Sequence, residues 1–395
     1  MNKSKKIMIA AVVFIAAINA LAWTSTKFCD FYIANIFPLW INTYGRFSGL
    51  FAFSLGERLI VAGIVLLVCA FFIVPIIFAI CGLINAIVRK KTGSDKRLNK
   101  IFFKGFYMFF TLVVIVVGLL LTLNYSVLYH GSAFADKYMQ GSRERFEDEE
   151  LIILRNMVVE KCNEYAMIIE RDENGDPTYE ASVEEMSEKI AEAMAKIGEE
   201  YPLLSGYYPR AKAMTFSDIM CQEHMQGYYF PFSMESNINV VMNRLRQPAT
   251  IAHEYAHLHG FILEDEANFI GYLACVNADD PYYKYSGYLS VLNYLSNDIY
   301  KRYRSNPNRF ADATEAVPLL KVSDQVKRDN YFVKEEQWER INKKAVVDTE
   351  TVDKVSDSFT DVSIKINGVS DGMASYSRVV TLLLQYYDGE LFVQE

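Results

Sequence analysis

Cysteine motifs that bind zinc or form a disulfide framework are missing from this 395-residue sequence. The six cysteines show no CxxC pairing and no regular spacing, so neither kind of site can be inferred from them. The sequence also has no internal repeat, no low-complexity tract and no glycine-rich phosphate loop. Repeat architectures and nucleotide-binding phosphate loops are therefore excluded.

Acidic residues are scarce in the first third of the chain. Residues 1–125 contain 13 basic and 3 acidic side chains, a net charge of +10, whereas residues 126–395 contain 27 basic and 45 acidic side chains, a net charge of −18. This division excludes a uniformly mixed soluble enzyme. It also excludes nucleic acid as a partner, because the large acidic part would repel phosphates and the positive charge lies between apolar runs.

Three long runs in the first third contain no charged residue. They cover residues 7–23, 59–88 and 105–123, and a helix needs about 20 apolar residues to cross a lipid bilayer. Residues 1–125 are therefore predicted to form a membrane domain with three transmembrane helices. For the first run a cleaved signal peptide stays open as a second interpretation, because lysines precede it and Ala20-Leu21-Ala22 lies near its end.

The distribution of basic residues predicts the orientation of these helices. The loop of residues 89–100 carries six basic residues and one acidic residue, and loops of this kind stay in the cytoplasm. We therefore expect a multi-pass protein of the plasma membrane in which residues 126–395 form an extracytoplasmic domain. The aromatic-rich segment 24–58 is expected to form a loop or short helices at the outer membrane surface.

The polar part of the chain is predicted to be mostly helical, with a few strands. Apolar residues at helical spacing predict helices over residues 143–171 and 183–199, and helix returns over residues 249–304. Residues 214–220 and 227–241 are rich in β-branched and aromatic residues, which favours short strands. Residues 304–367 read as irregular, and a last helix is expected over residues 372–387.

A short histidine motif is the main candidate for a metal-binding site in this sequence. The chain has five histidines, and three of them lie in the string His253-Glu254-Tyr255-Ala256-His257-Leu258-His259. In a helix of about residues 249–259, His253 and His257 lie on one face, where two imidazoles can share a Zn²⁺ ion. Glu254 lies one step around the helix and can reach a water on the metal without being a ligand.

A third ligand is expected from the acidic segment that follows Gly260. Glu264 stands in the first turn of the next predicted helix and is our preferred ligand, with Glu266 as the alternative. Asn268 shares a face with Glu264 and could hydrogen-bond a ligand. His259 lies on another helix face, so we do not expect it to bind the metal, and Leu263 occupies the position where a third histidine would stand in an HExxHxxGxxH pattern.

These residues together resemble the bacterial domain-of-unknown-function 3810 family, whose members are membrane proteins with a zincin-like region. The resemblance implies an α-helical membrane region plus a mostly helical α+β zincin-like domain, and it covers most of the chain. In Glu-type zincins the first Glu of an ExxA(D/N) string binds zinc, which favours Glu264. The family confers no substrate. The matching segments are Phe53–Glu57, Tyr229–Ser233 with Glu235 and Asn237, Ala252–His257, Gly260-Phe261, Glu264–Phe269, Asn367-Gly368 and Tyr376–Val380.

The expected function is that of a membrane-anchored zinc metallopeptidase that hydrolyses a peptide or protein substrate. Zinc would lower the pKa of a bound water to about 7, and Glu254 would take up the proton and return it to the leaving amine. Tyr228, Tyr229 and His224 are candidate donors to the oxyanion. Residues 227–239 are a candidate edge strand for an extended peptide. Residues that could support the ligands are Glu235, Asn237 and Asn239.

Two other hypotheses remain open at the level of sequence. In the first, the protein binds zinc without hydrolysis, as an envelope sensor or assembly factor in which a side chain such as Glu266 or His259 closes the fourth metal position. In the second, the HExxH string is accidental and the chain is a structural membrane protein. The sequence predicts neither the substrate nor the oligomeric state.

Overall fold

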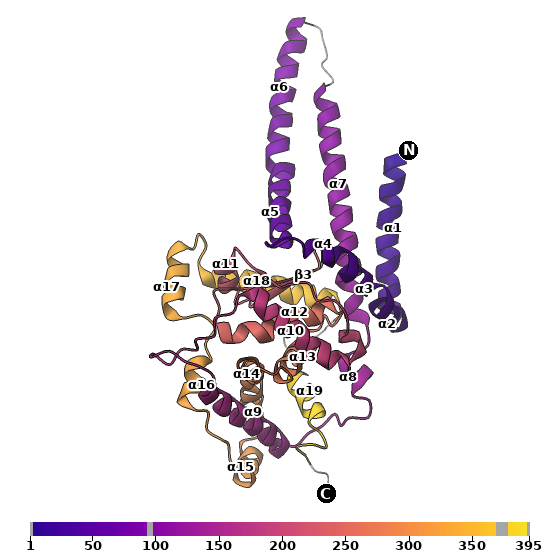
Figure 1. Cartoon of the computed structure of the whole chain (residues 1–395). Coiled ribbons are helices and arrows are strands. Elements are labelled where there is room, and N and C mark those ends of the chain that lie inside the picture. Colours follow the sequence, from indigo (N-terminus) through magenta and orange to yellow (C-terminus); the bar gives the residue numbers. More distant parts are fainter. Residues whose placement is uncertain (1–2, 93–97, 369–377, 393–395) are drawn as a thin grey trace.

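The computed structural model describes residues 3–92, 98–368 and 378–392. Three helices project from one side of a helical body (Figure 1). They are α1 (Lys3–Thr24), the continuous helix formed by α5 (Leu55–Val68), the π-helical η2 (Cys69–Ile73) and α6 (Val74–Thr92), and α7 (Leu98–Asn124). Each is long and apolar enough to cross a membrane. The predicted number of spans is confirmed, and the protein is a multi-pass membrane protein.

The chain between the first two spans forms the predicted short helices. These are α2 (Thr26–Asn35), α3 (Phe37–Trp40), η1 (Ile41–Gly45) and α4 (Arg46–Ser48). One side of this segment is buried against the body through residues such as Cys29 and Ile33, while Phe31 and Leu39 are exposed. An amphipathic segment at the base of the spans is a suitable surface for the membrane interface.

The body is built on five long helices that pack around a tyrosine-rich core. They are α9 (Asp148–Ile168), α10 (Val183–Gly198), α12 (Gln247–Leu258), α13 (Glu264–Val276) and α14 (Pro281–Ser305), which confirms the helices predicted for these regions. Helix α13 contacts α12 and α14, and α14 contacts α9. The largest fully buried side chains of the core include Tyr255, Tyr272, Tyr283 and Tyr285.

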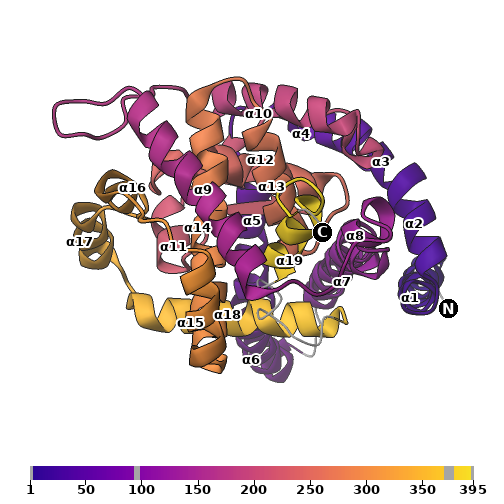
Figure 2. The ribbon, with the colours of Figure 1, turned by 90° about the horizontal axis from the view of Figure 1, so that it is seen from below.

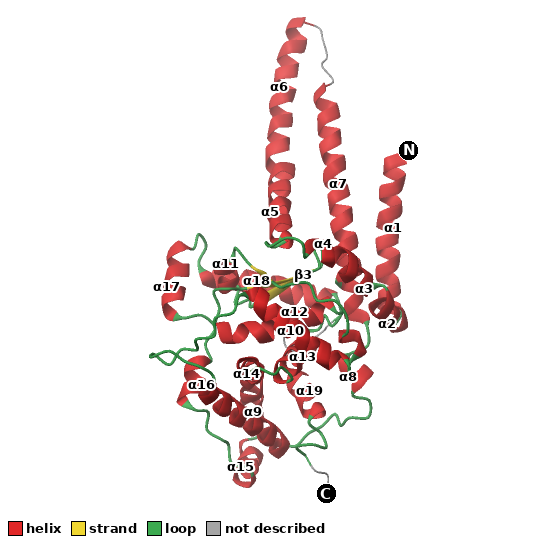
Figure 3. Cartoon of the chain, in the orientation of Figure 1, coloured by secondary structure: helices red, strands yellow, loops and turns green. Residues whose placement is uncertain are grey.

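The body contains a small sheet of three strands, in the order β1 (Lys212–Ala213), β3 (Glu235–Ile238) and β2 (Gly227–Phe230). Strand β1 is parallel to β3, and β2 is antiparallel to it, with Tyr228 opposite Asn237. Strand β2 is thus an outer strand of the described sheet. Figure 3 shows the strands at the side of the body from which the spans project.

The predicted strand over residues 214–220 is wrong. Helix α11 (Ser217–Gln222) occupies most of this segment. The Ser217 hydroxyl donates to the Met214 carbonyl, and Asp218 stands in the first helical turn, where a negative charge is favourable. The predicted strand over residues 227–241 is interrupted by the turn between β2 and β3 and ends at Ile238, because the Asn239 side chain accepts hydrogen bonds from the backbone of Val241 and Met242.

The segment 304–367, expected to be irregular, is mostly helical. It contains α15 (Pro307–Ala316), α16 (Asp324–Asp329), α17 (Glu335–Lys344) and α18 (Thr349–Ile366). Three of these helices begin after capping side chains, those of Asn306, Ser323 and Asp348, each of which accepts a backbone hydrogen bond. Capping side chains therefore stabilise helices in a segment whose polar composition gives no clear helical pattern.

The remaining elements connect these parts. The last helix, α19 (Arg378–Tyr386), agrees with the C-terminal portion of the predicted helix, and residues 372–377 of that prediction lie outside the described residues. Figure 2 shows α18 along one side of the body, extending from near α17 toward α7. The short helical elements are η3 (Ser126–His130), α8 (Phe134–Tyr138), η4 (Pro202–Leu204) and η5 (Arg244–Arg246).

Candidate metal centre

Two tightly packed helices carry the histidine motif and the acidic segment. Helix α12 begins with Pro248 in its first turn and ends before Gly260, whose φ of +92° is a backbone conformation that favours glycine. The turn leads directly into α13. At Gly271 of α13, an added Cβ would lie 2.9 Å from the Ala249 carbonyl oxygen of α12, so only glycine permits this approach of the two helices. Their close packing brings the start of α13 beneath the histidines.

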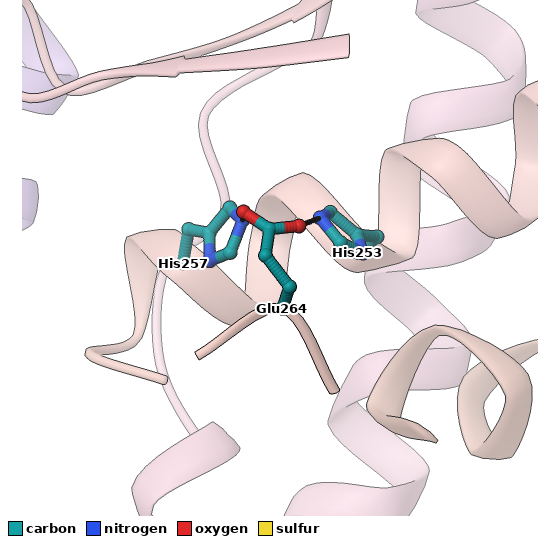
Figure 4. Close-up of side chains that lie close together, drawn as sticks. All are labelled: His253, His257 and Glu264. Atoms are coloured by element: carbon teal, nitrogen blue, oxygen red, sulfur yellow. Dashed lines mark ion pairs between the residues drawn. The ribbon is translucent and has the colours of Figure 1, made fainter. Parts of the chain in front are cut away.

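His253, His257 and Glu264 converge on a common point (Figure 4). One ligand atom from each residue lies within 4.8 Å of the others. The Nε2 atom of His253 is 3.2 Å from Oε2 of Glu264, and Nε2 of His257 is 3.7 Å from Oε1 of the same carboxylate. Two imidazole nitrogens and one carboxylate oxygen are a donor set that catalytic zinc sites use. The residues present therefore fit a zinc ion.

Both imidazole rings are fixed by hydrogen bonds on the side away from Glu264. His253 Nδ1 lies 3.0 Å from Oδ1 of Asn268, and His257 Nδ1 lies 2.8 Å from the carbonyl oxygen of Phe261. Both partners are acceptors, so each ring carries its hydrogen on Nδ1 and, when neutral, presents the Nε2 lone pair to the cluster. Asn268 thus hydrogen-bonds a candidate ligand, as predicted from the sequence. The Phe261 carbonyl orients the His257 ring in the same way as Asn268 orients the His253 ring.

The charges of the cluster are strongly coupled. Burial opposes ionisation of Glu264, but the hydrogen bond with His253 and the charges of the imidazoles lower its pKa to about 2. Burial would likewise lower the pKa of His253, yet the hydrogen bond and charge of Glu264 raise it above its ordinary value. Burial and the charge of His253 lower the pKa of His257 to about 4. When His253 is protonated, its positive charge holds the Glu264 carboxylate where a metal cation would hold it.

Glu254 is buried beside the cluster without being part of it. Its Oε2 atom has no hydrogen-bond partner among the described residues, and burial raises the pKa of the carboxyl to about 8. The side chain lies against Gly227 of β2, where an added Cβ would be 2.5 Å from Oε1 of Glu254. Gly227 therefore makes room for this carboxylate, and one of its oxygens is free to take up a proton from a ligand in the cavity.

Two residues considered as ligands from the sequence lie elsewhere. Glu266 is buried and accepts a hydrogen bond from the backbone N–H of Phe134, so the alternative third ligand is not in the cluster. His259 is buried as well, with Nδ1 3.0 Å from the Leu203 carbonyl oxygen and its ring stacked on Tyr208. Neither side chain is directed at the cluster, because each serves a different contact of the core.

The candidate oxyanion donors differ in how far their polar atoms are engaged. The Tyr229 hydroxyl donates to the Asn124 carbonyl, and His224 is exposed and paired with Asp353, so neither is directed at the ligands. The Tyr228 hydroxyl donates to Glu223 but lines the same cavity as the ligands. Tyr229 lines this cavity as well, but only the Tyr228 hydroxyl has its described partner, Glu223, in the cavity wall, which makes Tyr228 the best placed of the three predicted donors.

Sequence reasoning missed Tyr294. This residue of α14 lines a cavity together with His253 and Glu264, its side chain hydrogen-bonds Asn268, and its pKa is raised to about 12 by burial and by the charge of Glu264. Nothing in the sequence distinguishes it among 26 tyrosines. Its hydroxyl is an additional candidate donor at the site.

The three predicted supporting residues of β3 and the following turn serve other purposes. Glu235 pairs with Lys212, and Asn239 contacts Cys221 and caps the turn after β3. Asn237 donates to the carbonyl oxygens of Tyr228 and Glu235. These contacts stabilise the sheet beside the site. The prediction that the three residues hydrogen-bond the metal ligands is therefore wrong.

An open cleft leads to the cluster. It consists of two adjoining cavities of about 660 Å³ and about 440 Å³, and both are lined by His253, Glu254 and Glu264. Helix α18 forms the opposite wall through residues that include Ser356 and Thr360. The cluster is therefore accessible from two sides. The two cavities together are large enough for an extended peptide of several residues.

Comparison with known proteins identifies the family of this chain. Neither the curated proteins nor the solved structures include one that matches this chain. The model of the family described as Protein of unknown function (DUF3810) matches residues 32–384, which agrees with the resemblance seen in the sequence and extends from α2 to α19. The chain belongs to this family.

Proposed function

We propose that the protein is a membrane-anchored, zinc-dependent metallopeptidase. The observation that carries the proposal is the arrangement of four side chains at an open cleft. His253, His257 and Glu264 converge, and Glu254 lies beside them with one carboxylate oxygen that no residue in the described part of the chain hydrogen-bonds. Hydrolytic zinc sites have this composition, with three protein ligands, a position left for water and a carboxylate as proton acceptor.

The residues of the site have distinct roles in this proposal. A zinc ion held by the three ligands would supply Lewis acidity and lower the pKa of a bound water. Glu254 accepts the proton of the attacking water and delivers it to the leaving amine. Asn268 and the Phe261 carbonyl keep the imidazoles oriented, and Tyr228 and Tyr294 are placed to donate to the oxyanion.

Strand β2 is suited to hold the peptide backbone. It is an outer strand of the sheet, and its residues Gly227, Tyr228 and Tyr229 line the larger cavity next to Glu254. An extended segment that adds to this strand would place its backbone along the cleft without contacts specific to one side chain.

The same proposal places the body outside the cytoplasm. The N-terminal lysines and the end of α6, which carries Arg89 and Lys90, lie at the ends of the spans away from the body (Figure 1). Basic residues at membrane helix ends favour the cytoplasmic side. Both features support an extracytoplasmic active site.

The alternative of a zinc protein without hydrolytic activity requires a closed metal position. Glu266 and His259 were the candidates for closing it, and their contacts with Phe134 and Leu203 direct them elsewhere. The open cleft and the unpaired oxygen of Glu254 support the hydrolytic function over this alternative.

Substitution of the proton acceptor tests the proposal. We expect Glu254→Gln to retain about one zinc per chain, because no ligand is changed, and to reduce hydrolysis of a mixture of unstructured peptides by about 10²–10⁴-fold. Zinc content by mass spectrometry and peptide cleavage by chromatography measure the two effects in the full-length protein. An unchanged cleavage rate, or wild-type protein that cleaves no peptide when loaded with zinc, contradicts the proposal.

A further inference from the structure

We propose that the substrate is a membrane-anchored polypeptide that is cut in the segment next to the bilayer. This inference rests on the proposed function and adds a substrate class to it. It follows from the way the cleft is attached to the membrane spans and from the difference between its two cavities.

The metal centre lies one side chain away from the end of the third span. Asn124, the last residue of α7, donates from Nδ2 to the Pro231 carbonyl over 2.9 Å and accepts at its own carbonyl from the Tyr229 hydroxyl over 2.9 Å. The Tyr229 ring is in turn 6.1 Å from the ring of His257, measured between centroids. Only the tyrosine separates the end of the membrane helix from a metal ligand.

The start of the second span is attached to the same β-hairpin. The backbone N–H groups of Leu55 and Gly56, in the first turn of α5, donate to the carboxylate of Glu235 on β3, at 3.2 and 2.7 Å. Gly56 lies so close to Phe230 of β2 that an added Cβ would be 2.2 Å from its ring. Two spans therefore hold the hairpin from both sides, which fixes the depth and the orientation of the cleft relative to the bilayer.

The larger cavity has a mostly apolar wall and lies at the base of the spans. Tyr125 and Tyr129, directly after α7, line it together with Val355 and Phe359 of α18. Tyrosines at the end of a membrane helix are typical of the membrane–water interface. The side chains of α18 are open to a ligand, since Val355 is 66% and Phe359 is 76% exposed.

The smaller cavity is more polar than the larger one and leads away from these tyrosines. Its wall includes Asn293, Asn297 and Asp357, and it meets the larger cavity at the metal cluster. An extended peptide that leaves the bilayer would therefore place apolar residues in the larger cavity, its scissile bond at the cluster, and polar residues in the smaller cavity. Segments that connect a membrane helix to a soluble domain have this order of side chains.

Helix α18 is held across the cleft at both ends. At its start, the Gln222 side chain donates to the Val347 carbonyl, and at its end Ser363 shares a hydrogen bond of 3.2 Å with the Tyr125 hydroxyl. Gly368, which follows α18, lies against Trp23 at the end of α1. The apolar wall of the cleft is thus attached to the bases of the first and third spans.

The test uses the full-length protein in vesicles of phosphatidylcholine and phosphatidylglycerol. One probe is an apolar transmembrane helix followed by an unstructured tail with apolar and then polar residues, and the second probe is the same tail without the helix. We expect the zinc-loaded protein to cut the anchored probe at least tenfold faster than the free tail. When a polar spacer is inserted after the helix, we expect the cut to stay at the same distance from the membrane.

A matched pair of variants tests the apolar wall. Val355→Ser is expected to slow cleavage of the anchored probe severalfold, whereas Val362→Ser, an equally conservative change at an exposed position of α18 that does not line either described cavity, is expected to leave it unchanged. In Glu254→Gln protein, a photoreactive group in the apolar part of the anchored probe should crosslink to α18, which reports binding without hydrolysis.

The possible outcomes separate this inference from the proposed function. Equal cleavage of the two probes, or a cut that follows the inserted spacer, overturns the membrane-anchored substrate and leaves the peptidase intact. Absence of cleavage of both probes by zinc-loaded wild-type protein overturns both. Both are supported if the anchored probe is cut faster and at a fixed distance from the membrane, and if Val355→Ser, but not Val362→Ser, slows this cleavage severalfold.

Discussion

Two buried charged clusters lie close to the sheet, one formed by Lys212 and Glu235 and the other by the histidine motif, and they differ in how completely their atoms are paired. In the first, the Lys212 ammonium group contacts the carbonyl oxygens of Ser48, Phe51 and Phe53 as well as Oε1 of Glu235. The two side chains are 3% and 1% exposed. Both oxygens of Glu235 also accept from the backbone at the start of α5. This cluster is closed and joins the sheet to the second span.

The second cluster is open. His253, His257 and Glu264 face a cleft, and within the described ranges Oε2 of Glu254 has no hydrogen-bond partner. Unpaired buried polar atoms cost free energy, so their retention beside a cavity indicates a ligand. A buried cluster in which every polar atom is hydrogen-bonded is typical of a structural role. A cluster whose side chains converge but leave polar atoms without partners is typical of a ligand-binding site.

The largest expected effect concerns the closed cluster. Lys212→Met leaves the Glu235 carboxylate buried without its counter-ion, which should lower the free energy of unfolding by about 3–5 kcal/mol. The double variant Lys212→Met/Glu235→Gln removes both charges and should recover part of this loss. Thermal unfolding in detergent measures both, and the folded fraction should still bind one zinc. A single variant as stable as wild type would mean that this cluster is not structural.

A smaller effect is expected for the support of the open cluster. Asn268→Ala removes the hydrogen bond that orients the His253 ring but no ligand, so zinc affinity should fall by about 10- to 100-fold while the stoichiometry stays at about one. Competition with a fluorescent chelator measures the affinity. If the variant binds no zinc at all, or if its zinc affinity equals that of the wild type, Asn268 does not act by orienting the His253 ring.

The smallest expected effect is the pH dependence of zinc binding. The pKa of His253 is raised by Glu264, whereas the pKa values of His257 and Glu264 are about 4 and about 2. Above pH 5 only His253 among the three ligands has to lose a proton, so affinity should increase with pH by about tenfold per unit until the pKa of His253 is passed. Calorimetry in two buffers near pH 6 should show release of about one proton in the Glu254→Gln variant, which lacks the neighbouring carboxyl with a pKa of about 8. Release of two protons by this variant would show that His257 is not held neutral.

The sequence predicts the parts of this molecule that depend on local pattern. The spans follow from uncharged length alone, and the ligands follow from the i, i+4 spacing of His253 and His257 and from the short distance to Glu264 after the turn at Gly260. The wall of the cleft was not predicted, although Val352, Val355 and Phe359 stand at helical spacing after the Asp348 cap, because the acidic residues between them hide the pattern.

The features that sequence could not predict depend on contacts between distant residues. Lys212 contacts the segment that precedes α5 across more than 150 positions, and Asn124 contacts Tyr229 across 105. These contacts arise from the packing of the spans against the sheet, and no local periodicity reports them. Tyr294 reaches the site for the same reason, because the packing of α14 on α13 decides which of its tyrosines faces Asn268.

The binding of one zinc ion by His253, His257 and Glu264 can be tested by the zinc content of two matched variants, Glu264→Gln and Glu266→Gln. Both positions lie in the first turn of α13, and the glutamine at 266 can still accept from the Phe134 backbone. After dialysis against buffered zinc, we predict about one ion per chain in the wild type and in Glu266→Gln, and far less in Glu264→Gln. Equal zinc content in the two variants, or a wild type without zinc, would contradict the account.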